Sequence, residues 1–157
     1  MRSFYIFLLL IISLSGEAQP ARIKNFNELI ASLSTGERVR AVIHYAKCRF
    51  STEGSKQSPA PDAITGMDID TFEYFAPGAA HNLKAFLVFS QMKMIQNPKG
   101  KGFVYNYGKV RINEDDSVTV LAKYVNPKNF KVVMDESFSG ILNNGNNGGG
   151  IDLFKTY

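Results

Sequence analysis

The sequence predicts a mainly β protein that carries one N-terminal helix. After Gly36, apolar residues recur at every second position over long stretches, which is the spacing of strands in a sheet. Short polar turns separate several of these stretches, and such turns favour hairpins between strands that are neighbours in sequence. We therefore expect an antiparallel meander of about seven strands, forming a strongly curved sheet or a small barrel that limits exposed strand edges.

One amphipathic helix is predicted over residues 23–33 (IKNFNELIASL), where the apolar residues have helical spacing. Asn25 or Asn27 can cap its start with a side-chain oxygen. Gly36 can end it, because glycine adopts positive φ at little cost. We expect this helix to cover one end of the sheet.

The predicted strands follow in order along the rest of the chain. They are expected at residues 39–50, 66–75, 83–95, 103–112, 117–125, 130–138 and 151–157. A polar loop is expected at 51–62, and a glycine-rich and asparagine-rich loop at 143–150.

Residues 1–18 have the features of a secretory signal peptide. A short positive end precedes an apolar run at residues 4–14, and small residues follow at Gly16 and Ala18. The run is too short for a membrane-spanning helix, which needs about 20 apolar residues. We expect cleavage to leave residues 19–157 as a single domain that is periplasmic or secreted and does not span the membrane. Nucleic acid is then excluded as a partner.

The formal net charge is +4, and the positive charge is concentrated in residues 84–131, where acidic residues occur only at 114–116. Such a basic face could meet anionic lipid, a polysaccharide or an acidic protein, or it could be an ordinary solvated surface. An anionic envelope component is therefore one candidate partner.

Cys48 is the only cysteine of the chain. It could be buried and structural, reactive, or paired with another molecule. On a strand His44 would lie about 13 Å away, too far for a direct thiolate–imidazole pair.

Asp68 and Asp70 alternate within the predicted strand 66–75 and would then share a face about 7 Å apart. Paired carboxylates serve glycoside hydrolysis or help to bind calcium, but two acids on a solvated strand are also common. No calcium-loop pattern surrounds them. We expect neither a metal nor a cofactor.

Four residues of the predicted strand 103–112 form a candidate ligand-binding face: Tyr105, Tyr107, Lys109 and Arg111. They point the same way because strand side chains alternate. The face could be a stacking platform for a sugar or another ring, or one half of the core.

Several short segments resemble the VirK family of small exported bacterial proteins. These are residues 39–48 (VRAVIHYAKC), 64–69 (ITGMDI), 72–75 (FEYF), 110–112 (VRI), 124–128 (YVNPK) and 134–136 (MDE). The resemblance spans nearly all of residues 19–157, and Cys48 matches a cysteine of that pattern. It implies a small protein with a signal peptide, and it transfers no activity, ligand or catalytic residue.

The leading functional hypothesis is an exported, non-enzymatic β module that binds a small apolar or aromatic ligand or an envelope component. A second is a secreted protein-interaction or inhibitor module that uses the basic region 84–131 or an exposed sheet edge. A third is an enzyme, either a hydrolase that uses Asp68 and Asp70 or a thiol enzyme that uses Cys48.

Overall fold

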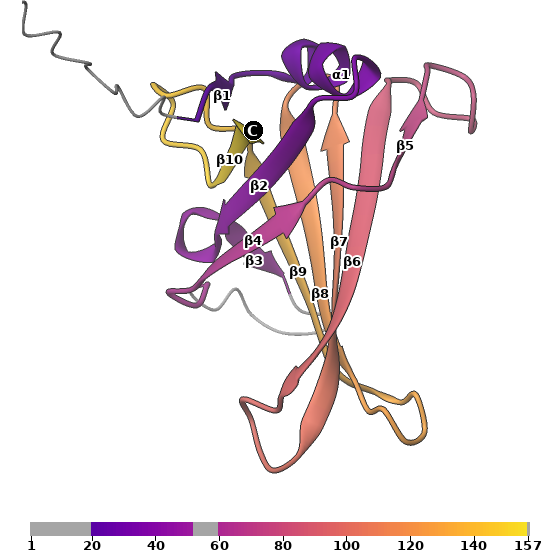
Figure 1. Cartoon of the computed structure of the whole chain (residues 1–157), viewed down its shortest axis with the longest axis vertical. Helices are drawn as coiled ribbons and strands as arrows, with labels where there is room; N and C mark the ends of the chain where they lie inside the picture. The colour runs from indigo at the N-terminus through magenta and orange to yellow at the C-terminus, as the bar shows by residue number, and fades with distance from the viewer. Residues whose placement is uncertain (1–19, 52–59, 157) are drawn as a thin grey trace, which may run out of the picture.

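Two antiparallel sheets and a helix at one end make up the fold in a computed structural model that describes residues 20–51 and 60–156 (Figure 1). The signal peptide predicted at 1–18 lies outside the described residues. In the described part of the chain, no helix is both long and apolar enough to cross a bilayer.

The described elements are ten strands, one α-helix and one 3-10 turn. In chain order they are β1 (Arg22–Ile23), α1 (Phe26–Ser34), β2 (Arg38–His44), η1 (Tyr45–Lys47), β3 (Arg49–Ser51), β4 (Ile64–Asp68), β5 (Phe72–Phe75), β6 (Phe86–Gln96), β7 (Phe103–Asn113), β8 (Ser117–Val125), β9 (Val132–Ile141) and β10 (Ile151–Thr156). The small sheet has the strand order β1-β10-β2-β4, and the large sheet has the order β3-β9-β8-β7-β6-β5.

The prediction of about seven strands was wrong because two predicted strands are each divided between the sheets. The stretch 39–50 becomes β2 and β3, since η1 interrupts the extended backbone. The stretch 66–75 becomes β4 and β5, since the chain leaves β4 at Ile69, whose N–H donates to the Val39 carbonyl at 2.9 Å. These two divisions and β1 account for the three additional strands.

The barrel prediction was also wrong. In the described part of the chain, the large sheet has two separate edges, β3 and β5, which do not pair with each other. Each divided strand carries the chain from the small sheet into the large one, so neither sheet is continuous enough to close on itself.

The meander prediction is confirmed for β6, β7, β8 and β9, which pair antiparallel in chain order. β8 has the predicted bounds, and β7 extends one residue further than predicted. The turn between these two strands is closed by a hydrogen bond from the Asp116 N–H to the Asn113 carbonyl, with Asp116 at φ 63°.

The predicted helix begins three residues later than expected. The Asn25 side chain accepts a hydrogen bond from the Glu28 N–H at 2.9 Å, while the Glu28 carboxylate accepts from the Lys24 N–H at 2.8 Å. The Glu28 carboxylate therefore bonds the residue before the cap, one residue earlier than in a standard capping box. Beyond the helix, Gly36 adopts φ 80°, as predicted.

Helix α1 is attached to both sheets at one end of the molecule (Figure 1). Its first residue, Phe26, donates its backbone N–H to the Asp116 carboxylate at 2.7 Å and packs its ring 6.4 Å from Tyr74. The core lies between the sheets below this helix. Its largest fully buried side chains are Phe138, Ile23, Leu29, Ile43, Leu87, Ile112, Leu142, Ile151, Leu153, Val39, Val110 and Val118.

Strand β10 joins the small sheet rather than extending the meander beyond β9. It lies between β1 and β2, and Leu153 pairs with both Ile23 and Ala41. Its Asp152 carboxylate is buried, accepts a hydrogen bond from Arg22 of β1, and lies 3.1 Å from the Nε2 of His44 on β2. One buried carboxylate therefore connects the three strands β1, β10 and β2.

The loop predicted at 143–150 folds around its asparagine side chains. Asn147 donates from its side chain to the Leu142 carbonyl at 2.8 Å, and its side-chain oxygen accepts from the Gly149 N–H at 3.0 Å. Gly149 is buried against the backbone of residues 141–143. This packing holds the connection from β9 to β10 against the end of the large sheet.

Candidate functional site

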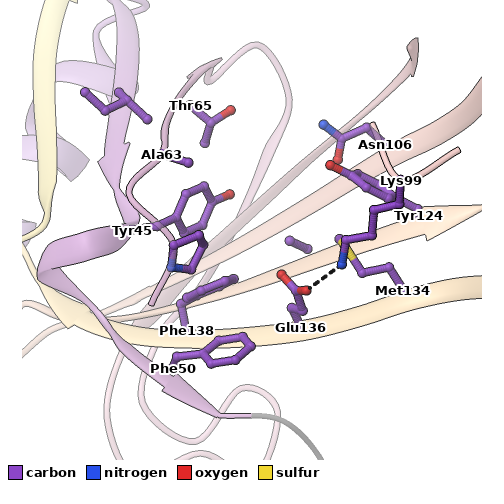
Figure 2. Close-up of a pocket in the computed structure, with 13 residues that line it drawn as sticks. Tyr45, Phe50, Ala63, Thr65, Lys99, Asn106, Tyr124, Met134, Glu136 and Phe138 are labelled. Carbon is purple, nitrogen blue, oxygen red and sulfur yellow. Dashed lines mark hydrogen bonds and ion pairs between the residues drawn. The ribbon is translucent and has the colours of Figure 1, made fainter. Parts of the chain in front are cut away.

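A cleft of about 510 Å³ lies between the sheets and is shown in Figure 2. Here β6 to β9 extend beyond the small sheet (Figure 1), so part of their inner face remains open. The cleft is lined by Tyr45, Phe50, Pro61, Ala63, Ile64, Thr65, Lys99, Asn106, Ala122, Tyr124, Met134, Glu136 and Phe138.

Three aromatic rings form one side of the cleft (Figure 2). Phe138 of β9 is almost fully buried, and its ring centroid lies 4.5 Å from that of Tyr45 and 5.0 Å from that of Phe50. Rings packed against one another at such distances hold fixed orientations. They therefore give the cleft a preformed apolar wall.

Tyr45 is positioned by the turn that ends β2. Its backbone N–H donates to the Ala63 carbonyl at 3.0 Å, and its carbonyl accepts from the Cys48 N–H at 2.8 Å. Burial raises the pKa of the Tyr45 hydroxyl to about 12, and the nearby Cys48 and Glu136 act in the same direction. At neutral pH the hydroxyl is therefore a neutral group that can donate a hydrogen bond to a ligand.

We expect Tyr45 to ionise near pH 12, about two units above an ordinary tyrosine. Because the folded-state pKa is raised, the unfolded chain loses this proton first, and stability falls as the pH rises from about 10 toward 12. Difference absorbance at 295 nm between the protein and Tyr45→Phe would isolate this titration. A difference signal centred near pH 10 would contradict the burial argument.

The other side of the cleft is more polar. Tyr124 and Met134 come from β8 and β9, and Asn106 comes from β7 (Figure 2). Lys99, from the loop between β6 and β7, reaches across to Glu136 and pairs with its carboxylate at 3.2 Å. This ion pair supplies both a donor and an acceptor beside the apolar wall.

Small residues leave the space between these two sides. Gly108 and Ala122 are paired in the register of β7 and β8, and both face the inner side of the large sheet. A smaller extension of about 120 Å³ continues from Ala122 across Gly108 toward Gln91 and Lys93 of β6. At Gly108 an added Cβ would lie 3.3 Å from the Met67 sulfur, so glycine lets β4 approach closely.

The arrangement suits binding of a molecule with an apolar or aromatic body. The volume of the cleft lies within the range of about 300–1,000 Å³ that is usual for small-molecule sites, and the few polar groups of the cleft would orient a ligand. In the described part of the chain, no three His, Cys, Asp or Glu side chains are grouped to hold a metal ion.

The four residues of the predicted ligand-binding face lie on the outer face of the large sheet, away from the cleft. Tyr105 stacks with Phe130 at 6.4 Å between ring centroids, and the Arg111 guanidinium lies 3.7 Å above the Phe86 ring. Tyr107 and Lys109 are half-buried between them on the same strand face. A ligand role for this face stays a prediction.

Asp68 and Asp70 do not share a strand face. Asp68 ends β4 and pairs with Arg40 at 2.8 Å, whereas Asp70 is exposed in the bend before β5. The paired-carboxylate geometry depended on an unbroken strand over 66–75, and this strand is divided between the two sheets.

The Cys48 side chain lies between Gly140 and Gly150, close to the end of β2. An added Cβ would lie 3.2 Å from its sulfur at Gly140 and 2.8 Å at Gly150. The thiol is buried and lies 3.5 Å from the His44 carbonyl, and burial raises its pKa. These conditions favour the neutral thiol over the nucleophilic thiolate. A reactive role for Cys48 stays a prediction.

The cleft residues were not identified from the sequence. Strand alternation groups Tyr45 with the buried β2 residues, and it does not show that η1 turns the chain there. A usable signal was present in β7 and β8, where Gly108 and Ala122 interrupt bulky residues on the same face. Small residues facing one another across two paired strands indicate an unfilled space.

Two comparisons, one with family models and one with solved structures, found proteins that are similar to this chain. A family model described as VirK protein matches residues 22–130 of this chain. The structure is also similar to the crystal structure of a VirK family protein from Legionella pneumophila, with a TM-score of 0.66 and 16% sequence identity. That match covers 85% of this chain and 98% of the other, and at this identity it shows a shared fold. A search of curated proteins found no match.

Proposed function

This chain belongs to the VirK protein family, and we propose that it is an exported, non-enzymatic β module that binds a small ligand with an apolar or aromatic body. The observation that carries the proposal is the cleft between the sheets, with its aromatic wall on one side and its polar groups on the other. The N-terminal pattern at residues 1–18 supports export.

The chemistry of the cleft narrows the ligand class. Tyr45 and Phe50, which pack on the buried ring of Phe138, offer ring faces and edges for an aromatic or alicyclic body. The Asn106 amide and the Lys99–Glu136 ion pair offer hydrogen bonds to one polar group of the ligand. A small amphipathic component of the cell envelope has this combination of groups.

Native mass spectrometry of the protein from its exported fraction, without reductant, tests the proposal. We expect additional mass from a bound small molecule that is lost when the protein is denatured. The remaining mass should equal residues 19–157. A bare mass that also fails to bind 1-anilinonaphthalene-8-sulfonate would sink the ligand hypothesis and favour a protein-interaction module.

A substitution that fills the cleft should remove the ligand. Ala122→Phe places a large ring at the smallest side chain that β8 contributes to the cleft. We expect the affinity for the ligand to fall about tenfold or more, which corresponds to about 1.4 kcal/mol. Leu121→Phe is the matched control, because the neighbouring side chain points to the opposite face of the sheet. Thermal unfolding of both variants would show whether the fold survives. Equal ligand retention would place the site elsewhere.

A further inference from the structure

The two hairpins of the large sheet end in loops of the same design. Residues 97–102 (NPKGKG) join β6 to β7, and residues 126–131 (NPKNFK) join β8 to β9. In each loop the first asparagine donates its backbone N–H to the carbonyl of the last residue at 2.8 Å. Its side-chain oxygen accepts the N–H of the lysine two residues later, at 3.0 Å in the first loop and 2.9 Å in the second.

Both loops lie at the end of the molecule opposite α1 (Figure 1). We call the two loops, together with the exposed Met92, Met94, Phe103 and Val132 beside them, the twin tip. Each loop is closed by its asparagine and stiffened by the following proline, so its lysines project from a defined turn. The stacking of Phe130 on Tyr105 also attaches the second loop to β7.

The twin tip is basic. The sequence has no aspartate or glutamate between residues 92 and 111 or between 119 and 134. The nearest acids, Asp135 and Glu136, are each paired with a lysine, at 2.8 Å and 3.2 Å. In the described part of the chain, Lys101, Lys128 and Lys131 are exposed and make no ion pair.

The twin tip is also apolar, on the outer face of the large sheet. Phe130 is 72% exposed, Phe103 and Met94 are each 61% exposed, and Met92 and Val132 beside them are also exposed. The strand registers bring these positions together, since Met94 pairs with Tyr105 and Tyr105 pairs with Val125. A contiguous exposed apolar surface of this kind marks an interaction site.

We propose that the twin tip is a docking surface for an anionic phospholipid bilayer. The unpaired lysines contact headgroup phosphates, and the exposed Phe103, Phe130 and Met94 enter the interfacial layer. Such a bilayer can interact with both the lysines and the apolar side chains of the twin tip. A polysaccharide would interact with the lysines but leave the aliphatic side chains in water. A protein partner fits less well, because lysine is depleted in protein–protein interfaces.

Sedimentation with vesicles of phosphatidylglycerol and phosphatidylcholine, compared with pure phosphatidylcholine, tests the charge requirement. We expect binding only to the anionic vesicles, and weaker binding as salt rises. Each lysine near such a surface contributes about 1 kcal/mol, so the triple variant Lys101→Gln, Lys128→Gln and Lys131→Gln should lose on the order of a hundredfold in affinity.

A second triple variant is the matched control. Lys24→Gln, Arg38→Gln and Lys47→Gln remove the same charge from exposed positions outside the twin tip. We expect this variant to bind almost as well as the unmodified protein. An equal loss in both variants would mean that net charge alone drives binding, and it would overturn the proposal. Vesicle binding should also survive Ala122→Phe, which alters only the cleft.

Insertion of the apolar side chains can be measured separately by tryptophan fluorescence, because the chain contains no tryptophan. Phe130→Trp introduces a single fluorophore at the twin tip, and its emission should shift to the blue with anionic vesicles and be quenched by brominated lipid. Leu83→Trp is the control, since Leu83 is 96% exposed in the loop between β5 and β6 near α1. No shift at position 130, an equal shift at position 83, or no vesicle binding would overturn the proposal.

Discussion

Replacing Asp152 by alanine is expected to lower the free energy of unfolding by about 3 kcal/mol. The Asp152 side chain is 8% exposed and receives both the Arg22 guanidinium and the His44 imidazole. Removing it leaves two polar groups at a strand interface without their shared acceptor. We expect a loss at the lower end of the range for broken buried ion pairs. Arg22 and His44 are both partly exposed, so water can replace some of the lost hydrogen bonding.

Urea unfolding of Asp152→Ala would measure this loss, and Asp68→Ala supplies the control. Asp68 also forms an ion pair within the small sheet, with Arg40, but both side chains are more than 40% exposed. Exposed pairs contribute about 0–1 kcal/mol, so the control should change little. Similar losses in the two variants would show that burial of Asp152 does not determine its contribution.

Replacing Gly149 by alanine is expected to cost about 3 kcal/mol of stability. An added Cβ would lie 2.7 Å from the Ile141 carbonyl oxygen, 2.8 Å from that of Leu142 and 2.9 Å from the Asn143 nitrogen. These are backbone atoms at the end of β9, so no side chain can rotate away to relieve the contact. The chain must instead shift where β9 leads into the loop before β10.

Gly100→Ala is the matched control for this substitution. Gly100 lies in the loop between β6 and β7, and an added Cβ there would meet only the Asn97 side chain, whose nitrogen would be nearest at 3.2 Å. We expect a change within about 0.5 kcal/mol, as for most surface substitutions. Thermal unfolding of the two variants gives the comparison, and a Gly149→Ala protein as stable as its control would refute the packing argument.

Local patterns predicted the part of the fold that is made by neighbours in sequence. The alternation in residues 117–125 identified β8, and the helical spacing before Gly36 identified α1. The divisions at η1 and at Ile69 were not predicted, because neither point is marked by a proline or a glycine turn. Pairing of β10 with β2 depends on contacts between distant residues, which alternation cannot encode.

The candidate site was missed for a related reason. Both faces of β7 carry apolar residues, and alternation does not show which face points inward. The aromatic face, with Tyr105 and Tyr107, points outward, because Gly108 on the other face allows Met67 of β4 to pack closely. The cleft then arises from the different lengths of the two sheets, which is a property of the tertiary structure.

The place of β10 between β1 and β2 has a consequence for the order of assembly. His44 and Asp152 lie 108 residues apart, so β2 is synthesised long before the strand that covers it. The hairpins from β6 to β9 pair locally, and local contacts form faster than distant ones. We therefore expect the large sheet to form first and the small sheet to wait for β10. Because the cleft takes its walls from both sheets, we expect it to be incomplete in a nascent chain until β10 has been made.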